Sequence, residues 1–262
     1  MKHFPAYQID AFTIGPFTGN PAAVCVLNEW LTDDIMQKIA MENNLSETAF
    51  IVPSGGEWLI RWFTPVTEVD LCGHATLASS YVILNILNPE KDKVSFSTLK
   101  LGSLTVRKKG DILELDLPAD TLQECILPDL VRESMGKAPL EWFMGRSDYL
   151  LLYGTENDIL DLNPDFRRLG RADGRGVIAT APGSDTDFVS RFFAPQAGID
   201  EDPVTGSAHT TLTPFWSARL GKKSMRARQL STRGGYLECT LSGDRTLIAG
   251  HALLYLKGEI FI

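Results

Sequence analysis

Two glycines in this sequence stand where a loop runs into a predicted helix of small residues, a place suited to binding anions. Gly73 opens the segment GHAT, and Gly206 opens the segment GSAH. A helix start exposes unpaired N–H groups and partial positive charge, which attract carboxylates or phosphates. A glycine there can also serve tight packing alone. Because the two segments lie at equivalent points of an internal repeat, described below, we expect both to face one ligand cleft between the two halves.

Glu47 is a candidate acid–base residue. It enters a predicted strand, ETAFIV, that is otherwise apolar, and it shares a strand face with Ala49 and Ile51. A carboxyl group beside apolar walls is suited to taking up and returning a proton. An exposed strand end, or a partner arginine, would give the same local sequence. The repeated half has Val177 or a neighbour at this point, so the fold itself does not require the acid.

Two further side chains near the glycines could touch a substrate. His74 could cap its helix, donate to a bound anion or carry a proton. Asp202 ends the acidic run that starts at Asp200, and such runs are more often solvated or cap the next helix. His209 lies one turn into the second helix and is interpreted as structural. No His or Cys pair has the spacing of metal ligands, so we expect no metal site.

Cys72 lies directly before Gly73. A thiol beside a helix N-terminus can be acidic and reactive. The repeated half has Val204 and Thr205 before Gly206, and therefore no thiol at this point. A symmetric mechanism with two thiols is thus excluded.

An internal duplication positions these residues. The segment RWFTP at 61–65 recurs as RFFAP at 191–195, and each copy reaches an aspartate at the same distance, Asp70 and Asp200. The glycine then follows after a gap that is three residues longer in the second copy. Segments 31–35 and 50–53 also resemble 162–166 and 178–182, in the same order. We therefore predict two homologous halves, 1–116 and 117–262, with a final strand that can cross back to the first half.

Short alternating strands dominate both halves, so each is predicted to be an α+β unit with strands wrapped around a central helix. Strands are predicted at 7–12, 22–27, 59–63, 93–97 and 104–108, and 251–262 is predicted as a hairpin-like run broken at Lys257 and Gly258. The segment 31–43 predicts an amphipathic helix capped by Thr32. The helix after Gly73 has almost no polar face, which predicts burial.

Composition excludes several classes of protein. Hydrophobic residues make up 44% and charged residues 22%, as in soluble globular proteins. The net charge of −8 disfavours nucleic acid as a partner, because phosphates need a concentrated basic face. Four scattered cysteines indicate reduced thiols. We see no membrane span, signal peptide or Gly-x-Gly-x-x-Gly motif, and therefore expect a cytoplasmic protein without membrane contact or a dinucleotide cofactor.

Five motifs together resemble the phenazine-biosynthesis isomerase (PhzF-like) family. They are GNPAAV at 19–24, SETAF at 46–50, RWFTP at 61–65, DLCGHAT at 70–76 and EDPVTGSA at 201–208. The resemblance covers nearly the whole chain. It implies an internally duplicated two-domain diaminopimelate epimerase-like fold, with each half a strand-rich barrel around a central helix and the site between the halves. It also implies proton transfer by Glu47 without any cofactor.

The resemblance assigns the other site residues as well. His74 and Asp202 would complete the catalytic set and hydrogen-bond the substrate, while Gly73 and Ser207 would hold its carboxylate. Asn20, Thr205 and Gly206 are the further substrate-binding residues that it implies. A small carboxylate is the expected ligand, and a homodimer is a candidate assembly.

We therefore predict an isomerase that moves a proton on a small carboxylate or cyclic amino-acid-like substrate, with Glu47 as general acid/base. Two alternatives stay open. One is an amino-acid epimerase or racemase that uses Cys72, which the missing second cysteine disfavours. The other is a non-catalytic member that binds a small ligand or a protein. The presence of Glu47, His74 and Asp202 disfavours a pure scaffold.

Overall fold

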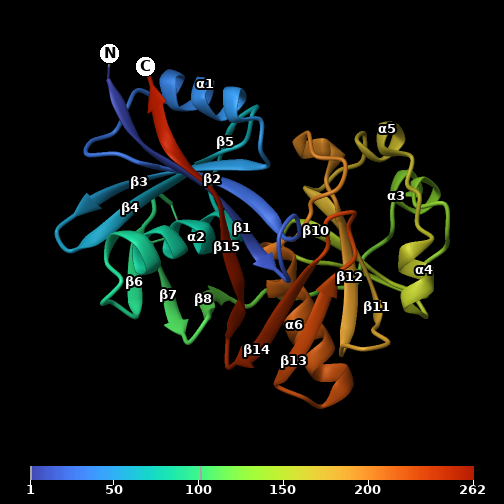
Figure 1. Ribbon diagram of the computed structural model, residues 1–262. Helices are drawn as coiled ribbons and strands as arrows, with labels where there is room; N and C mark the ends of the chain where they lie inside the picture. Colours follow the sequence, from blue (N-terminus) through green and yellow to red (C-terminus); the bar gives the residue numbers. More distant parts are fainter. Residues whose placement is uncertain (1, 101) are drawn as a thin grey trace. The chain divides into compact units, whose positions relative to one another are not determined.

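The chain divides into two units in the computed structural model, which describes residues 2–100 and 102–262 (Figure 1). The first unit comprises Met1–Leu117 and Ala249–Ile262, and the second comprises Pro118–Ile248. The boundary proposed from the sequence, between residues 116 and 117, lies beside this division. The final strand begins in the second unit and continues in the first, where the backbones of Lys2 and Ile262 exchange two hydrogen bonds.

The first unit is built mainly of strands with two helices. Its elements are β1 (His3–Thr13), β2 (Asn20–Val26), α1 (Asp33–Asn43), β3 (Glu47–Ser54), β4 (Glu57–Phe63), β5 (Glu68–Val69), α2 (Gly73–Val82), the π-helix η1 (Ile83–Leu87), β6 (Lys93–Ser97), β7 (Ser103–Lys109) and β8 (Ile112–Pro118). The last strand, β15 (Arg245–Phe261), pairs antiparallel with β1.

The second unit has the same mixture of elements. They are α3 (Asp129–Ser134), β9 (Glu141–Met144), β10 (Asp148–Leu152), α4 (Glu156–Leu160), α5 (Phe166–Leu169), β11 (Gly176–Pro182), β12 (Phe188–Phe193), the 3-10 helix η2 (Pro195–Ala197), α6 (Gly206–Leu220), β13 (Ser224–Gln229) and β14 (Gly235–Ser242).

The order of strand pairings repeats from one unit to the other. In the first, β1–β2 is antiparallel, β2–β3 parallel, β3–β4 antiparallel, β4–β6 parallel and β6–β7 antiparallel. In the second, β9–β10, β10–β11, β11–β12, β12–β13 and β13–β14 follow the same alternation. Parallel neighbours need a crossover segment, and all the described helices except α3 lie in those crossovers. The predicted duplicated α+β fold is confirmed.

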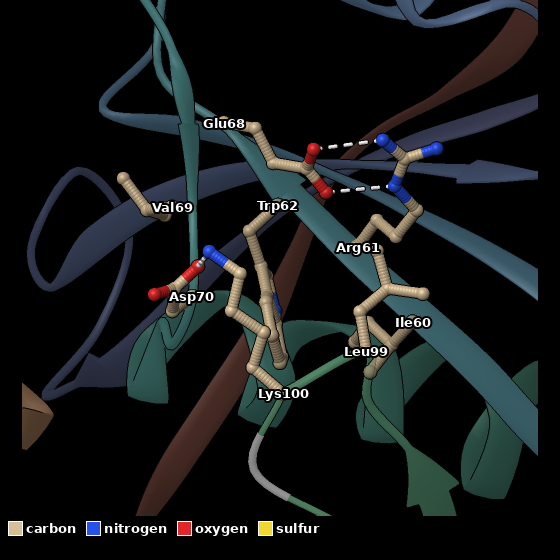
Figure 2. A pocket seen from close by; sticks show the side chains of 8 residues that line it. All are labelled: Ile60, Arg61, Trp62, Glu68, Val69, Asp70, Leu99 and Lys100. Carbon is tan, nitrogen blue, oxygen red and sulfur yellow. Dashed lines mark hydrogen bonds and ion pairs between the residues drawn. The ribbon is translucent and has the colours of Figure 1, made fainter.

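An arginine and a glutamate occupy equivalent places in the two units. Arg61 donates to both carboxylate oxygens of Glu68 at 2.7 Å, as Figure 2 shows, and Arg191 binds Glu201 in the same way at 2.7 and 2.9 Å. Each guanidinium also lies over a phenylalanine ring two residues further along its strand. Bidentate geometry and stacking are functions of arginine that lysine does not replace. The repeated RWF and RFF motifs therefore encode a repeated structural clamp.

The clamp corrects one detail of the predicted repeat. Glu68 lies five residues before Gly73, and Glu201 lies five residues before Gly206, so the three extra residues of the second copy precede the acid. They fall in the segment that contains η2. Asp70 and Asp200 are therefore not equivalent. Asp70 instead pairs with Lys100 at 2.7 Å, beside a cavity of about 80 Å³ that is lined by none of the predicted site residues (Figure 2).

The helix after Gly73, α2, is buried as predicted, with nine of its ten residues inaccessible. Three of these residues carry hydroxyl groups, and each hydroxyl has a hydrogen-bond acceptor within the helix or at its N-cap. The hydroxyls of Thr76, Ser79 and Ser80 donate to backbone carbonyls four residues earlier, at 2.6 to 2.8 Å. This back-bonding lets hydroxyl residues enter an apolar core. The small residues in turn let strands β1, β2 and β3 pack closely on the helix.

The equivalent helix, α6, contains Pro214 in its interior. Proline has no N–H, so the carbonyl of Thr210, four residues earlier, loses its usual helical donor. The backbone N–H of Asp120 donates to that carbonyl at 3.1 Å instead. The N–H of Asp120 therefore replaces the missing helical donor, and the helix continues to Leu220.

Two local predictions need correction. The helix predicted at 31–43 begins at Asp33, and although Thr32 is the N-cap residue, its hydroxyl makes no cap hydrogen bond. Two aspartates in the first turn supply the favourable charge there. The hairpin predicted at 251–262 is a single long strand, in which Gly258 pairs with Ala6. Because Lys257 and Gly258 both pair with residues of β1, the chain stays extended here and makes no turn.

Candidate active site

Glu47 and His74 form a buried ion pair in the first unit. Oε2 of Glu47 lies 3.2 Å from Nε2 of His74, and the side chains are 13% and 4% exposed. Glu47 is the first residue of β3, and His74 is the second residue of α2. Strand and helix therefore hold the two groups from separate directions. The structure thus brings together two residues that the sequence separates by 27 positions.

Asn20 completes this group from a third element. It is fully buried at the start of β2, the parallel neighbour of β3, and its Nδ2 lies 3.1 Å from Nδ1 of His74. Gly19 makes this placement feasible, because its φ is +77° and a Cβ there would lie 2.5 Å from the carbonyl oxygen of Ala11. An amide can donate to an unprotonated ring nitrogen or, after half a turn, accept from a protonated one. Asn20 can therefore accompany His74 through both protonation states.

Cys72 adds a thiol to the same group. Its Sγ lies 3.5 Å from Nδ1 and 4.0 Å from Nε2 of His74. Burial, together with the charge of Glu47, raises the pKa of Cys72 to about 11. At neutral pH the group is therefore a thiol rather than the acidic thiolate that a helix N-terminus can produce.

The charge state of His74 is set by its neighbours. Burial acts to lower the pKa of His74, but the negative charge that Cys72 and Glu47 place beside the ring outweighs burial and raises the pKa well above its ordinary value. Because Cys72 is protonated at neutral pH, the carboxylate of Glu47 is the partner that matters there. The surroundings of the ring therefore favour its protonated form.

The second unit has no acid at the position equivalent to Glu47. Thr48 faces Phe63 across β3 and β4, and Val177 faces Phe193 across β11 and β12. The residue before Val177 is Gly176, where a Cβ would lie 2.5 Å from Cζ of Phe192 and 2.8 Å from a backbone oxygen. No side chain fits there. The position equivalent to Glu47 is therefore Gly176, the neighbour of Val177.

The starts of α2 and α6 differ from those of the other described α-helices. Neither has a side-chain cap or an acidic residue in its first turn. By contrast, α1, α3 and α4 carry acids in the first turn, and α5 is capped by Asp165. The partial positive charge at the N-termini of α2 and α6 is thus left for another anion. Anion binding at Gly73 and Gly206 stays a prediction.

The predicted residues of the second unit gather at the start of α6. Thr205 is the N-cap residue, and its hydroxyl donates to the buried carboxylate of Asp202. Gln229, which the sequence analysis missed, holds the loop: its Nε2 donates to the Asp202 carbonyl at 2.7 Å, and its Oε1 accepts from the Thr205 N–H at 2.8 Å. Gly206 and Ser207 open the helix behind this loop. Asp202 is thus a buried, positioned acid rather than a solvated one.

His209 has the structural position that we predicted. It is fully buried in α6, and its Nδ1 lies 2.8 Å from the carbonyl oxygen of Thr205. Its ring lies beside Phe188.

Each of the two units thus holds one cluster of predicted site residues, and the proposal that the two clusters serve one substrate stays a prediction. None of the helices in residues 2–100 and 102–262 is long and apolar enough to cross a membrane.

Comparison with known proteins identifies close relatives of the chain. The family model for phenazine biosynthesis-like proteins (PhzC-PhzF) matches residues 9–258. An uncharacterized isomerase of Pseudomonas aeruginosa is 48% identical over 256 residues, which cover 98% of each chain. The crystal structure of a PhzF family phenazine biosynthesis protein from Enterococcus faecalis is 43% identical, covers all of both chains and superimposes with a TM-score of 0.95.

More distant structures share the fold alone. A hydroxyproline epimerase from Agrobacterium vitis, solved with bound trans-4-hydroxy-L-proline, is 10% identical and has a TM-score of 0.64. It covers 99% of this chain and 91% of its own. The duplicated fold is therefore the one that epimerases also use, as the sequence analysis predicted.

Proposed function

Because the chain belongs to the phenazine biosynthesis-like (PhzC-PhzF) family, we propose that it is an isomerase in which Glu47 moves a proton on a small carboxylate or cyclic amino-acid-like substrate. An isomerase-type enzyme is what the named relatives and the fold support. The single observation that carries the finer proposal is the buried pair of Glu47 and His74 at the start of α2. General acid–base catalysis needs a group that can both take and return a proton at one place.

The geometry supports a simple sequence of steps. The uncapped N–H groups at Gly73 and His74 bind the substrate carboxylate, as helix starts do. Glu47 removes a proton from a carbon next to a double bond or carbonyl, and the electron pair of that C–H bond shifts into the adjacent π-system. The carboxyl group then returns the proton to another carbon. His74 stabilises the carboxylate between turnovers, and Asn20 keeps the imidazole ring in place.

The second cluster remains part of the proposal. Asp202, Thr205, Gly206 and Ser207 are proposed to contact the substrate as well. The hydrogen bond between Thr205 and Asp202 and the contacts of Gln229 favour this role, because a pre-organised loop loses little entropy on binding. Asp202→Asn tests it, and we expect a higher KM together with a lower kcat.

Deuterium exchange tests the central step. The protein is incubated in D₂O with a panel of small unsaturated or cyclic amino acids and carboxylates, and label at carbon is followed by NMR. Glu47→Gln keeps the shape of the side chain but cannot carry a proton, so the rate should fall by about 10²-fold or more while ligand Kd changes only a few-fold. Glu57→Gln, at the exposed start of β4, is the matched control. An exchange rate unchanged by Glu47→Gln would refute the acid–base role.

The epimerase alternative makes a different prediction. An enzyme that uses Cys72 as a base needs the thiolate, and the raised pKa of Cys72 disfavours that form. Cys72→Ala should therefore keep most of kcat. A loss as large as that of Glu47→Gln would favour the epimerase.

A further inference from the structure

Three side chains of the types that bind zinc converge at the start of α2. They are the carboxylate of Glu47, the thiol of Cys72 and the imidazole of His74, whose ligand atoms all lie within 4.8 Å of one another. Cys72 and His74 are buried, and the Glu47 side chain is 13% exposed, with its Oε2 buried. Sulfur, nitrogen and carboxylate oxygen together are the donor set of a borderline-soft cation. We propose that these three residues form a binding site for Zn²⁺, and that binding releases the proton of the Cys72 thiol and one proton of the His74 ring to solvent.

The distances are close to those that a zinc ion needs. Zinc bonds of about 2.0 to 2.3 Å in a tetrahedron put the ligand atoms roughly 3.3 to 3.8 Å apart. In the structure, Nε2 of His74 lies 3.2 Å from Oε2 of Glu47 and 4.0 Å from Sγ of Cys72. All three ligand atoms lie within 4.8 Å of one another, and side-chain rotations would bring them to the spacing that zinc needs. Nε2 is therefore the histidine ligand atom, and Oε2 of Glu47 accepts no hydrogen bond from the described residues that it would have to give up.

Asn20 supplies the outer contact that such a site requires. A histidine that binds metal through Nε2 carries its proton on Nδ1 and donates it to a neighbouring acceptor. The side-chain amide of Asn20 lies at that nitrogen, 3.1 Å away, and half a turn presents its Oδ1 as the acceptor. Once its amide has turned, Asn20 can hold the ring in the tautomer that zinc needs.

Three protein ligands leave the fourth tetrahedral position open, as in zinc sites that exchange ligands. Occupancy also has a consequence for the proposed function, and this part rests on it. When a zinc ion occupies both Oε2 of Glu47 and Nε2 of His74, neither atom can exchange a proton. Zinc bound at this site therefore blocks proton transfer, and loss of the Cys72 ligand is expected to weaken both the binding and the inhibition.

Direct binding tests the site without any substrate. The intact protein is titrated with Co²⁺ and followed by absorption, because a thiolate ligand gives a cobalt charge-transfer band, and Zn²⁺ affinity is measured by calorimetry. We expect one equivalent of metal and a thiolate band. Cys72→Ala should lose the band and weaken zinc binding by at least about 10-fold, and Asn20→Ala should weaken it by about 10- to 100-fold. Cys125→Ala, which removes a thiol of the second unit, is the matched control and should bind like the parent.

Two results would overturn the site: no thiolate band in the parent protein, or equal zinc affinity in Cys72→Ala and Cys125→Ala. Circular dichroism of each variant shows whether it is folded. The inhibition is measured separately. Adding Zn²⁺ should abolish deuterium exchange by the parent protein, whereas Cys72→Ala should keep its exchange activity at the same Zn²⁺ concentration. If zinc binds as expected but no exchange occurs in the metal-free protein with any substrate, the proposed function fails and the metal site stands. If exchange occurs and zinc does not bind, the metal site fails and the proposed function stands.

Discussion

Acid should weaken this protein through one buried histidine, His209. Its Nδ1 donates to the Thr205 carbonyl, and its Nε2 is buried with no hydrogen-bond partner within residues 2–100 and 102–262. The neighbouring ring of Phe188 offers no acceptor. A proton added at Nε2 would place an unpaired charge in the core, and burial lowers the pKa of His209 to about 4.

The size of the effect follows from proton linkage. An unfolded histidine takes up a proton near pH 6.5, whereas folded His209 stays neutral down to about pH 4. Because the folded pKa is depressed, the stabilisation is fully present above pH 6.5 and is lost as the pH falls toward 4. Across this window the unfolded state binds up to one more proton. The free energy of unfolding should fall by up to about 1.4 kcal/mol per pH unit, and by about 3 kcal/mol in all.

Urea unfolding between about pH 7 and pH 4, on the parent protein and on a His209 variant, measures how much His209 contributes to the pH dependence of the free energy of unfolding. His209→Asn keeps an N–H donor near the Thr205 carbonyl but cannot titrate. We expect it to be less stable than the parent at neutral pH, because packing is lost, and to lose about 3 kcal/mol less on acidification. His3→Asn, at an exposed histidine, should follow the parent curve. Parallel curves for the parent and His209→Asn across the window would refute the reasoning.

Three further changes test other parts of the structure. Arg191→Met leaves the carboxylate of Glu201, 17% exposed, without its partner and should cost about 3–5 kcal/mol in urea unfolding, most of which the double variant with Glu201→Leu should recover. Gly176→Ala forces a methyl group against Phe192 and a backbone oxygen and should cost about 1–3 kcal/mol in the same assay, whereas an unchanged midpoint would show that the strand can move aside. Cys72→Ala should leave the melting temperature within a few degrees and keep most of the exchange activity, and a collapse of activity alone would assign the thiol a catalytic role.

The duplication was predictable because a motif with a structural function occurs once in each half of the chain. RWF and RFF each place an arginine between a glutamate and a phenylalanine ring, and such a clamp tolerates little substitution. The aspartates at 70 and 200 misled the comparison, because nothing in the local sequence marks where three inserted residues lie. The hairpin predicted at 251–262 failed for a related reason. A glycine next to a lysine suggests a turn, but pairing with β1 overrides local propensity.

The site was predictable in part. Glu47 and His74 could be named from their surroundings, but their contact depends on the parallel pairing of β2 with β3 and on where α2 begins. Gln229 gave no signal, because a single glutamine in an alternating strand is read as exposed. Its burial against the Asp202 loop comes only from tertiary packing. The zinc-type donor set was equally hidden, since Glu47 comes from a different segment than Cys72 and His74.

The ring of Phe192 behind Gly176 has a stereochemical consequence for any reaction at Glu47. A duplicated fold could have offered a second carboxyl group at the equivalent strand position, but that position is filled. If Glu47 both removes and returns the proton, as proposed above, it does so on one face of the substrate, so the transfer is suprafacial. Part of the abstracted hydrogen then returns before it mixes with water. A substrate deuterated at the reacting carbon should therefore pass some of its own label to the product, even when the reaction runs in ordinary water.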